Sequence, residues 1–142
     1  MKKLIYIIIS LILTSCELEM TDNGALDGNW QLRQIDTLST GGTCDMSRSY
    51  IYWAVQNDLL QVRDIDNADF RILFRFEKKG DHLTLRNPYH IIIKAELEPI
   101  EDIEQLTPYG IMGTEDTFTF ENLSSGNMTL KNESFRLHFR KY

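Results

Sequence analysis

Phe70-Arg71-Ile72-Leu73-Phe74-Arg75-Phe76-Glu77 is the stretch of the sequence that decides the fold. Apolar side chains fall on every second residue from Phe70 to Phe76, and the intervening positions are charged except for Leu73. Alternation with a period of two is typical of a β-strand that buries one face. We therefore predict a half-buried strand over residues 69–77.

The same alternation recurs on both sides of this stretch. The other strand candidates are a first strand with Trp30, Leu32 and Ile35, then 49–56, 59–65, 82–86, 89–98, 117–122, 127–131 and 135–140. Polar turns such as Asn57-Asp58 and Lys78-Lys79-Gly80-Asp81 separate neighbouring candidates. Short apolar-alternating runs divided by such turns predict hairpins.

One segment follows a helical period instead. Ile100, Ile103 and Leu106 lie three apart between Pro99 and Pro108, which predicts a short helix that begins after the first proline and ends before the second. Short strands joined by hairpin turns indicate an all-β meander, either a sandwich or a barrel. Closure into a barrel removes exposed sheet edges, so the predicted fold is an up-and-down antiparallel barrel of about eight strands.

The N-terminal segment has the composition of a cleaved export signal. Two lysines precede Leu4 to Leu13, which are almost all aliphatic, and this is typical of a secretory signal peptide. The run is shorter than the ~20 apolar residues of a membrane-spanning helix. Leu13-Thr14-Ser15-Cys16 resembles the lipobox of bacterial lipoproteins, in which the cysteine carries a diacylglyceryl group. We expect a lipoprotein signal peptide over 1–15 and membrane attachment through a lipid on Cys16; the alternative is an ordinary signal with a chance cysteine.

The mature chain is expected to hold its folded domain on a short tether. Residues 16–26 are mostly acidic, small or polar, and the barrel domain is predicted over 27–142. Glu17 and Glu19 resemble the signal that sends some Gram-negative lipoproteins to the cell surface. The expected location is therefore the cell envelope, at the outer membrane, on either its periplasmic face or the cell surface.

The charge of the chain excludes several partners. It has 15 Lys and Arg against 21 Asp and Glu, and loss of the two signal lysines leaves a net charge of −8. Nucleic acid and anionic lipid surfaces recruit basic patches, so we expect neither as a partner. Once Cys16 is lipidated, Cys44 is the one cysteine that remains, and no intrachain disulfide can form.

No motif in the sequence indicates catalysis or a bound metal. His82, His90 and His138 all fall on the outward phase of predicted strands, and no short-spaced ligand set accompanies them. Nucleophile elbows and phosphate loops are missing from the sequence as well. We expect a non-enzymatic protein without metal or cofactor. Asp36-Thr37-Leu38 resembles an O-glycosylation site of some periplasmic proteins, which marks Thr37 as a candidate modification site.

A family resemblance rests on the two ends of the domain. Gly28-Asn29-Trp30 opens the first strand and Arg140 lies near the end of the last one. A Gly-x-Trp with a late arginine resembles the lipocalins, and the whole domain is similar to small lipocalin-like lipoproteins. The resemblance implies that Trp30 closes one end of the barrel and that Arg140 packs across the indole. A guanidinium over an indole face is favourable by ~0.5–2 kcal/mol.

The inward residues of the predicted strands suggest two functions. Their expected lining is apolar and comprises Phe70, Ile72, Phe74, Leu83, Leu85, Phe118, Phe120 and Met128. If the interior is open, it would take a small apolar ligand, because unpaired polar burial costs ~1–3 kcal/mol per group. If side chains fill it, the domain is a structural or protein-interaction module of an envelope assembly. Barrels of this size do either, and the sequence names no protein partner.

Overall fold

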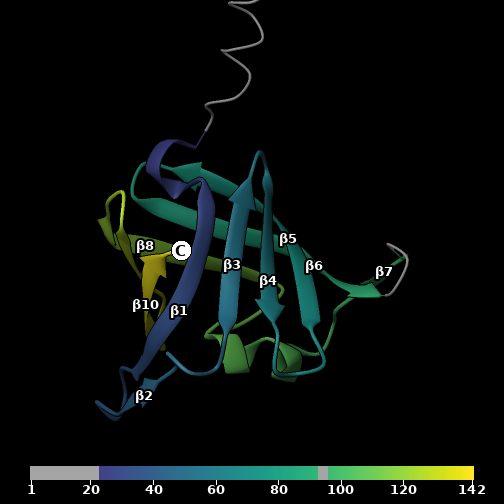
Figure 1. Cartoon of the computed structure of the whole chain (residues 1–142), viewed down its shortest axis with the longest axis horizontal. Coiled ribbons are helices and arrows are strands. Elements are labelled where there is room, and N and C mark those ends of the chain that lie inside the picture. The colour runs from purple at the N-terminus through teal and green to yellow at the C-terminus, as the bar shows by residue number, and fades with distance from the viewer. Residues whose placement is uncertain (1–22, 93–95) are drawn as a thin grey trace, which may run out of the picture.

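The computed structural model describes residues 23–92 and 96–142, which form a ten-stranded sheet rolled into a barrel (Figure 1). The strands are β1 (Gly28–Thr37), β2 (Thr43–Asp45), β3 (Ile51–Gln56), β4 (Leu59–Asp64), β5 (Phe70–Lys79), β6 (His82–Ile92), β7 (Glu96–Pro99), β8 (Glu115–Leu123), β9 (Asn127–Lys131) and β10 (Phe135–Lys141). All strands except β2 and β7 form the barrel in chain order, and β10 pairs antiparallel with β1 to close it. The predicted up-and-down barrel of eight strands is confirmed.

The core lies inside the barrel because each strand buries alternate residues. In β5, Ile72 and Phe74 have no accessible surface, whereas Arg75 is exposed. In β3, Ile51, Trp53 and Val55 are buried, and the residues between them point outward. The strand predicted from the alternation at 69–77 is therefore present as β5, with the expected face inside.

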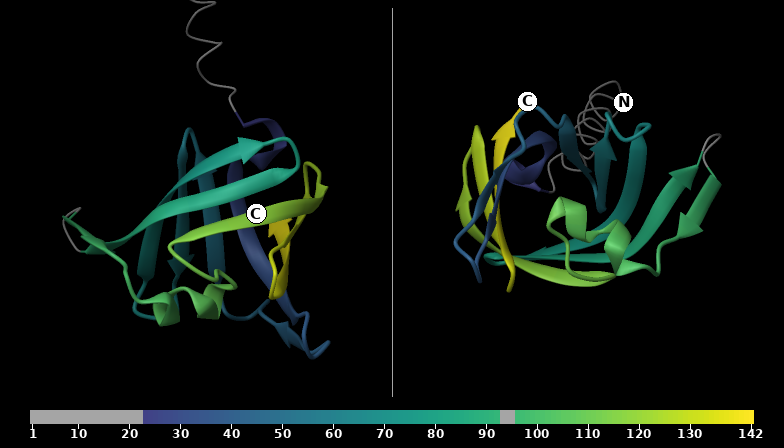
Figure 2. Two further views of the ribbon diagram at one scale, coloured as in Figure 1. Left: turned by 180° about the vertical axis from the view of Figure 1, so that it is seen from behind. Right: turned by 90° about the horizontal axis from the view of Figure 1, so that it is seen from below.

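Two short strands lie outside the ring. β2 pairs with the second half of β1, so the stretch between β1 and β3, for which no strand was predicted, contains a short one. β7 pairs with the far end of β6, and this hairpin projects from the barrel (Figures 1 and 2). The single strand predicted over 89–98 is wrong, because that stretch is divided between β6 and β7, with residues 93–95 outside the described residues.

A bulge in β6 reverses the predicted alternation. The pairing of β6 with β5 shifts by one residue around Asn87, whose φ of 52° lies in the left-handed region in which asparagine is enriched. An extra residue in a strand turns the following side chains to the opposite face. His90, expected to point outward, instead lies against Phe70, with 4.5 Å between the ring centroids.

The helical segments are single 3₁₀ turns: η1 (Gly24–Leu26), η2 (Ile103–Gln105) and η3 (Thr107–Tyr109). The helical segment predicted after Pro99 is thus present as η2 and η3, but η3 runs through Pro108 and does not stop before it. Proline fits the first turn of a helix, where its missing N–H has no partner to lose. In the described part of the chain, no helix has the length and apolar character needed to cross a membrane.

Candidate functional site

The eight residues expected to line the interior come together inside the barrel. Ile72, Phe74, Leu83, Leu85 and Phe118 have no accessible surface, and Met128 has 1%. Phe70 and Phe120 are partly buried and pack against the same hydrophobic cluster. A side chain without accessible surface touches no space that could hold a water molecule, whether outside the barrel or within it. The middle of the barrel is therefore filled by its own side chains.

Trp30 closes the end of the barrel at which the described chain begins. Its indole Nε1 donates a hydrogen bond of 2.9 Å to the carbonyl oxygen of Leu26, the fully buried last residue of η1. Residues 24–26, expected to belong to the tether, are thus part of the folded domain. Cys16 and the signal peptide, 1–15, lie outside the described residues, as does most of the tether.

The cation that covers the indole is Lys141, and the expectation for Arg140 is wrong. The Lys141 Nζ lies 4.6 Å from the centre of the Trp30 ring and donates hydrogen bonds to the carbonyl oxygens of Ala25 and Asp27 at 3.0 and 2.6 Å. Trp30 pairs with Lys141 across the β1–β10 ladder, one residue further along than expected. Arg140 belongs to the outward phase of β10 and is exposed.

Gly28 is required by this arrangement. Its φ of +127° is rarely adopted by other residues, and a Cβ atom there would lie 2.8 Å from the Lys141 Cε. Lys141 therefore crosses Gly28 on its way to the carbonyl oxygens. The two residues of the Gly-x-Trp pattern thus have separate roles. The glycine leaves space for the Lys141 side chain, and the ammonium group of that side chain covers the tryptophan ring.

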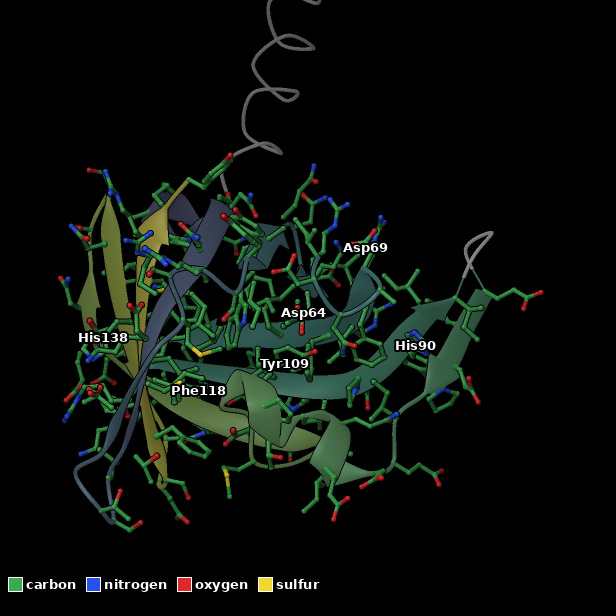
Figure 3. The ribbon with its side chains drawn as sticks, turned by 60° about the horizontal axis from the view of Figure 1, so that its bottom comes forward. Asp64, Asp69, His90, Tyr109, Phe118 and His138 are labelled. Atoms are coloured by element: carbon green, nitrogen blue, oxygen red, sulfur yellow. The ribbon has the colours of Figure 1, made fainter. Side chains whose placement is uncertain are left out.

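The opposite end is closed by residues 100–114, which we call the closing segment. Its 3₁₀ turns lie across the ring of strands in the view along the barrel (Figure 2, right). Leu106 and Ile111 have no accessible surface, and Tyr109 has 3%. The Tyr109 hydroxyl donates a hydrogen bond of 2.8 Å to Asp64 at the end of β4 (Figure 3). Burial raises the Tyr109 pKa to about 12, so the hydroxyl keeps its proton and remains a donor.

Asn132 fastens the closing segment to the barrel. Its side-chain amide donates to the carbonyl oxygen of Gly110 and to Asp116, each at 2.9 Å, and its oxygen accepts from the backbone N–H groups of Ser134 and Phe135 at 3.0 and 2.7 Å. Gly110 has a φ of +80°, and a Cβ atom there would collide with the side chain of Leu137. One buried side chain thus satisfies four polar groups at the junction of two segments.

Asp116 carries a charge into this junction. Its carboxylate accepts the Met112 N–H at 2.9 Å as well as the Asn132 amide. Burial is the largest influence on this carboxyl and raises its pKa, and the two hydrogen bonds oppose that effect. The charged form is therefore tolerated because donors of the closing segment and of Asn132 face it.

Several charged groups on the outer surface form structural pairs. Asp69 accepts hydrogen bonds from both Arg63 and Arg71, each at 2.6 Å, and these guanidinium groups hold its pKa well below the usual range. His138 lies 2.7 Å from Asp36, on the other side of the barrel from His90 (Figure 3). Thr37 is the partly exposed last residue of β1. Within residues 23–92 and 96–142, no group of three acidic, histidine or cysteine side chains is placed to hold a metal ion.

A closed eight-stranded meander with a tryptophan and a cation at one end defines the lipocalin-like class of protein. The profile of the family described as lipocalin-like domain matches residues 11–142. The chain belongs to this family.

Two solved structures share the fold. A lipocalin-like protein from Bacteroides uniformis is 22% identical with a TM-score of 0.65, over 84% of this chain and all of that one. An uncharacterized protein from Bacteroides eggerthii is 19% identical with a TM-score of 0.55, over 82% of this chain and 98% of that one. No curated protein matches the chain.

Proposed function

We propose that this protein is a lipid-anchored, non-enzymatic module of a bacterial envelope that binds its partners through the outer surface of a filled barrel. The observation that carries the proposal is the absence of accessible surface on Ile72, Phe74, Leu83, Leu85 and Phe118. Trp30 and Lys141 cover one end of the barrel beside an open hollow of about 860 Å³ whose lining includes Asn57, Phe76 and Leu123, and the closing segment lies across the other end. A ligand inside the barrel would have to displace packed side chains.

The anchor would keep one end of the domain close to the membrane. Six residues lie between Cys16 and Asn23, where the described residues begin, and the seven Cα-to-Cα steps of this stretch span at most ~25 Å. A lipid on Cys16 therefore holds the Trp30 end near the membrane. The closing segment, at the opposite end, is then the part of the domain that can extend farthest from the membrane.

The first test concerns the anchor. Metabolic labelling with a palmitate analogue should mark the wild-type chain in a bacterial host and leave Cys16→Ala unlabelled. The variant should also appear in the soluble fraction after cell lysis, whereas Cys44→Ala should behave as the wild type. A labelled Cys16→Ala protein would contradict the lipobox interpretation.

A small apolar ligand inside the barrel is the second candidate function. One observation favours it: within the described residues, the Trp53 Nε1 is the buried side-chain nitrogen that has no hydrogen-bond acceptor. An unsatisfied buried donor costs ~1–3 kcal/mol, and a guest with an acceptor oxygen would remove that cost. The Trp53 ring packs against Phe118 and Phe139, with centroids 6.0 and 4.8 Å away, so such a guest would have to part these rings.

Probe binding distinguishes the two candidates. The wild-type protein should bind neither a fluorescent fatty acid nor benzene, as measured by fluorescence titration and ligand-observed NMR. Phe118→Ala removes a fully buried ring, and apolar cavities made in this way bind benzene; this variant should therefore bind it, while Phe135→Ala, whose ring is only partly buried, should not. Saturable binding of the fatty acid by the wild type, at one molecule per chain, would establish the interior ligand instead.

A further inference from the structure

A hollow on the outside of the barrel is lined mainly by uncharged side chains. It has a volume of about 390 Å³ and is lined by Asn29, Tyr52, Ala54, Gln61, Arg63, Ile65 and Tyr142. These residues come from the outer faces of β1, β3 and β4, which run side by side (Figure 1), and from the residues that follow β4 and β10. Asn29, Ala54 and Gln61 are direct cross-strand neighbours, so the floor of the hollow is an uncharged row across three strands.

Two tyrosine rings form one wall of the hollow. Tyr52 and Tyr142 meet edge to face, with ring centroids 5.2 Å apart and an angle of 69° between the rings. The backbone N–H of Tyr142 donates to the carbonyl oxygen of Asn29 at 2.8 Å, which holds the base of this wall in place. Ala54, between the rings and Gln61, has the small side chain that leaves the space open.

The polar groups of the hollow remain available for a ligand. Within residues 23–92 and 96–142, the side chains of Asn29, Gln61, Tyr52 and Tyr142 make no hydrogen bond to another protein group. Arg63, by contrast, is committed to Asp69 through bonds of 2.6 and 3.2 Å. The hollow therefore offers amides and hydroxyls that donate and accept, while its one cation is already neutralised.

We propose that this hollow binds a neutral saccharide ring. A pyranose has an apolar C–H face, which suits the face of a tyrosine, and a rim of hydroxyls, which suits amides that both donate and accept. An anion is disfavoured because Asp69 occupies the guanidinium of Arg63. A wholly apolar ligand is disfavoured because it would leave Asn29 and Gln61 buried without partners, at the cost that unpaired polar groups carry.

The inference goes beyond the proposed function, and it needs neither an open barrel interior nor an anchor. In the test, full-length protein in phosphatidylcholine nanodiscs would be mixed with methyl glucoside, N-acetylglucosamine and their linear trisaccharides. Saturation-transfer NMR reports which sugar protons lie near the protein, and calorimetry gives the affinity. Empty nanodiscs provide the background. Binding of the trisaccharides alone points to a polysaccharide chain, and binding of the single sugars as well points to free sugar.

Three variants connect the signal to the hollow. Ala54→Leu should abolish saturation transfer by filling the space, and Tyr142→Ala, at a residue that is 80% exposed and so not needed for folding, should weaken binding roughly 3- to 10-fold. Thr129→Leu, an outward change on β9 away from the hollow, should bind as the wild type does. Absence of transfer from every sugar, or transfer that persists in Ala54→Leu, would overturn the inference. Neither result depends on fatty-acid binding, so failure here is separate from failure of the proposed function.

Discussion

Replacing Trp30 with alanine should lower the free energy of unfolding by ~3–5 kcal/mol. The indole has no accessible surface, so its removal leaves a cavity at the end of the barrel. The substitution also takes away the donor to Leu26 that holds η1 in place and the ring over which the Lys141 Nζ lies. Chemical denaturation followed by circular dichroism should show a lower midpoint with a similar slope.

A comparison of two neighbouring residues tests how this end is closed. Lys141→Met removes the cation from the indole and should lower the denaturation midpoint, because two carbonyl oxygens lose their donor. Arg140→Met is the matched control and should have little effect, since that side chain is exposed. An effect of Arg140→Met equal to that of Lys141→Met would mean that the register of β10 is different.

Asn132→Ala should lower the free energy of unfolding by ~2–4 kcal/mol at neutral pH. The amide is buried and serves four partners, so the substitution leaves the Gly110 carbonyl and the Asp116 carboxylate with fewer partners and two N–H groups with none. The loss of local stability should be largest in the closing segment. Hydrogen exchange should therefore accelerate around Gly110 and Met112 before the barrel strands exchange.

This variant should also change the dependence of stability on pH. Burial already raises the pKa of Asp116 above its ordinary value of 3.8, and loss of the Asn132 donor should raise it further. A carboxyl whose pKa is raised in the folded state stabilises the fold below its unfolded pKa, and this stabilisation is lost as pH rises through the folded pKa. The deficit of Asn132→Ala against the wild type should therefore shrink between pH 7 and pH 3. A deficit independent of pH would mean that Asp116 does not depend on Asn132.

The strands could be predicted because their information is local. Alternation over 69–77 indicates a strand whatever its neighbours are, and β5 occupies that stretch. The barrel could be predicted because a sheet of short strands joined by hairpins has exposed edges unless it closes. The wrong expectation for Arg140 shows the limit of this reasoning. Cations at positions 140 and 141 both fit the end of β10, and the register of β10 with β1 decides which one contacts Trp30.

Other parts of the molecule depend on contacts between distant residues. The bulge at Asn87 turns His90 inward, and the local alternation of apolar residues does not indicate an extra residue in the strand. The bond between Tyr109 and Asp64 joins residues 45 apart. The outer hollow arises because Ala54 and Gln61 meet across two strands. No local sequence pattern distinguishes these residues, because their roles depend on contacts that form only in the folded barrel.

The pairing of β1 with β10 also determines when the protein can fold. Asp36 and His138, which meet across this pair, are 102 residues apart, and contacts between such distant positions slow folding to milliseconds or longer. Until the last strand has been synthesised, β1 has one unpaired edge, and the sheet cannot close. If the chain is exported as we propose, it can cross the inner membrane as an unfolded polymer from the N-terminus onward. The order of its strands alone then delays folding until the whole chain has crossed.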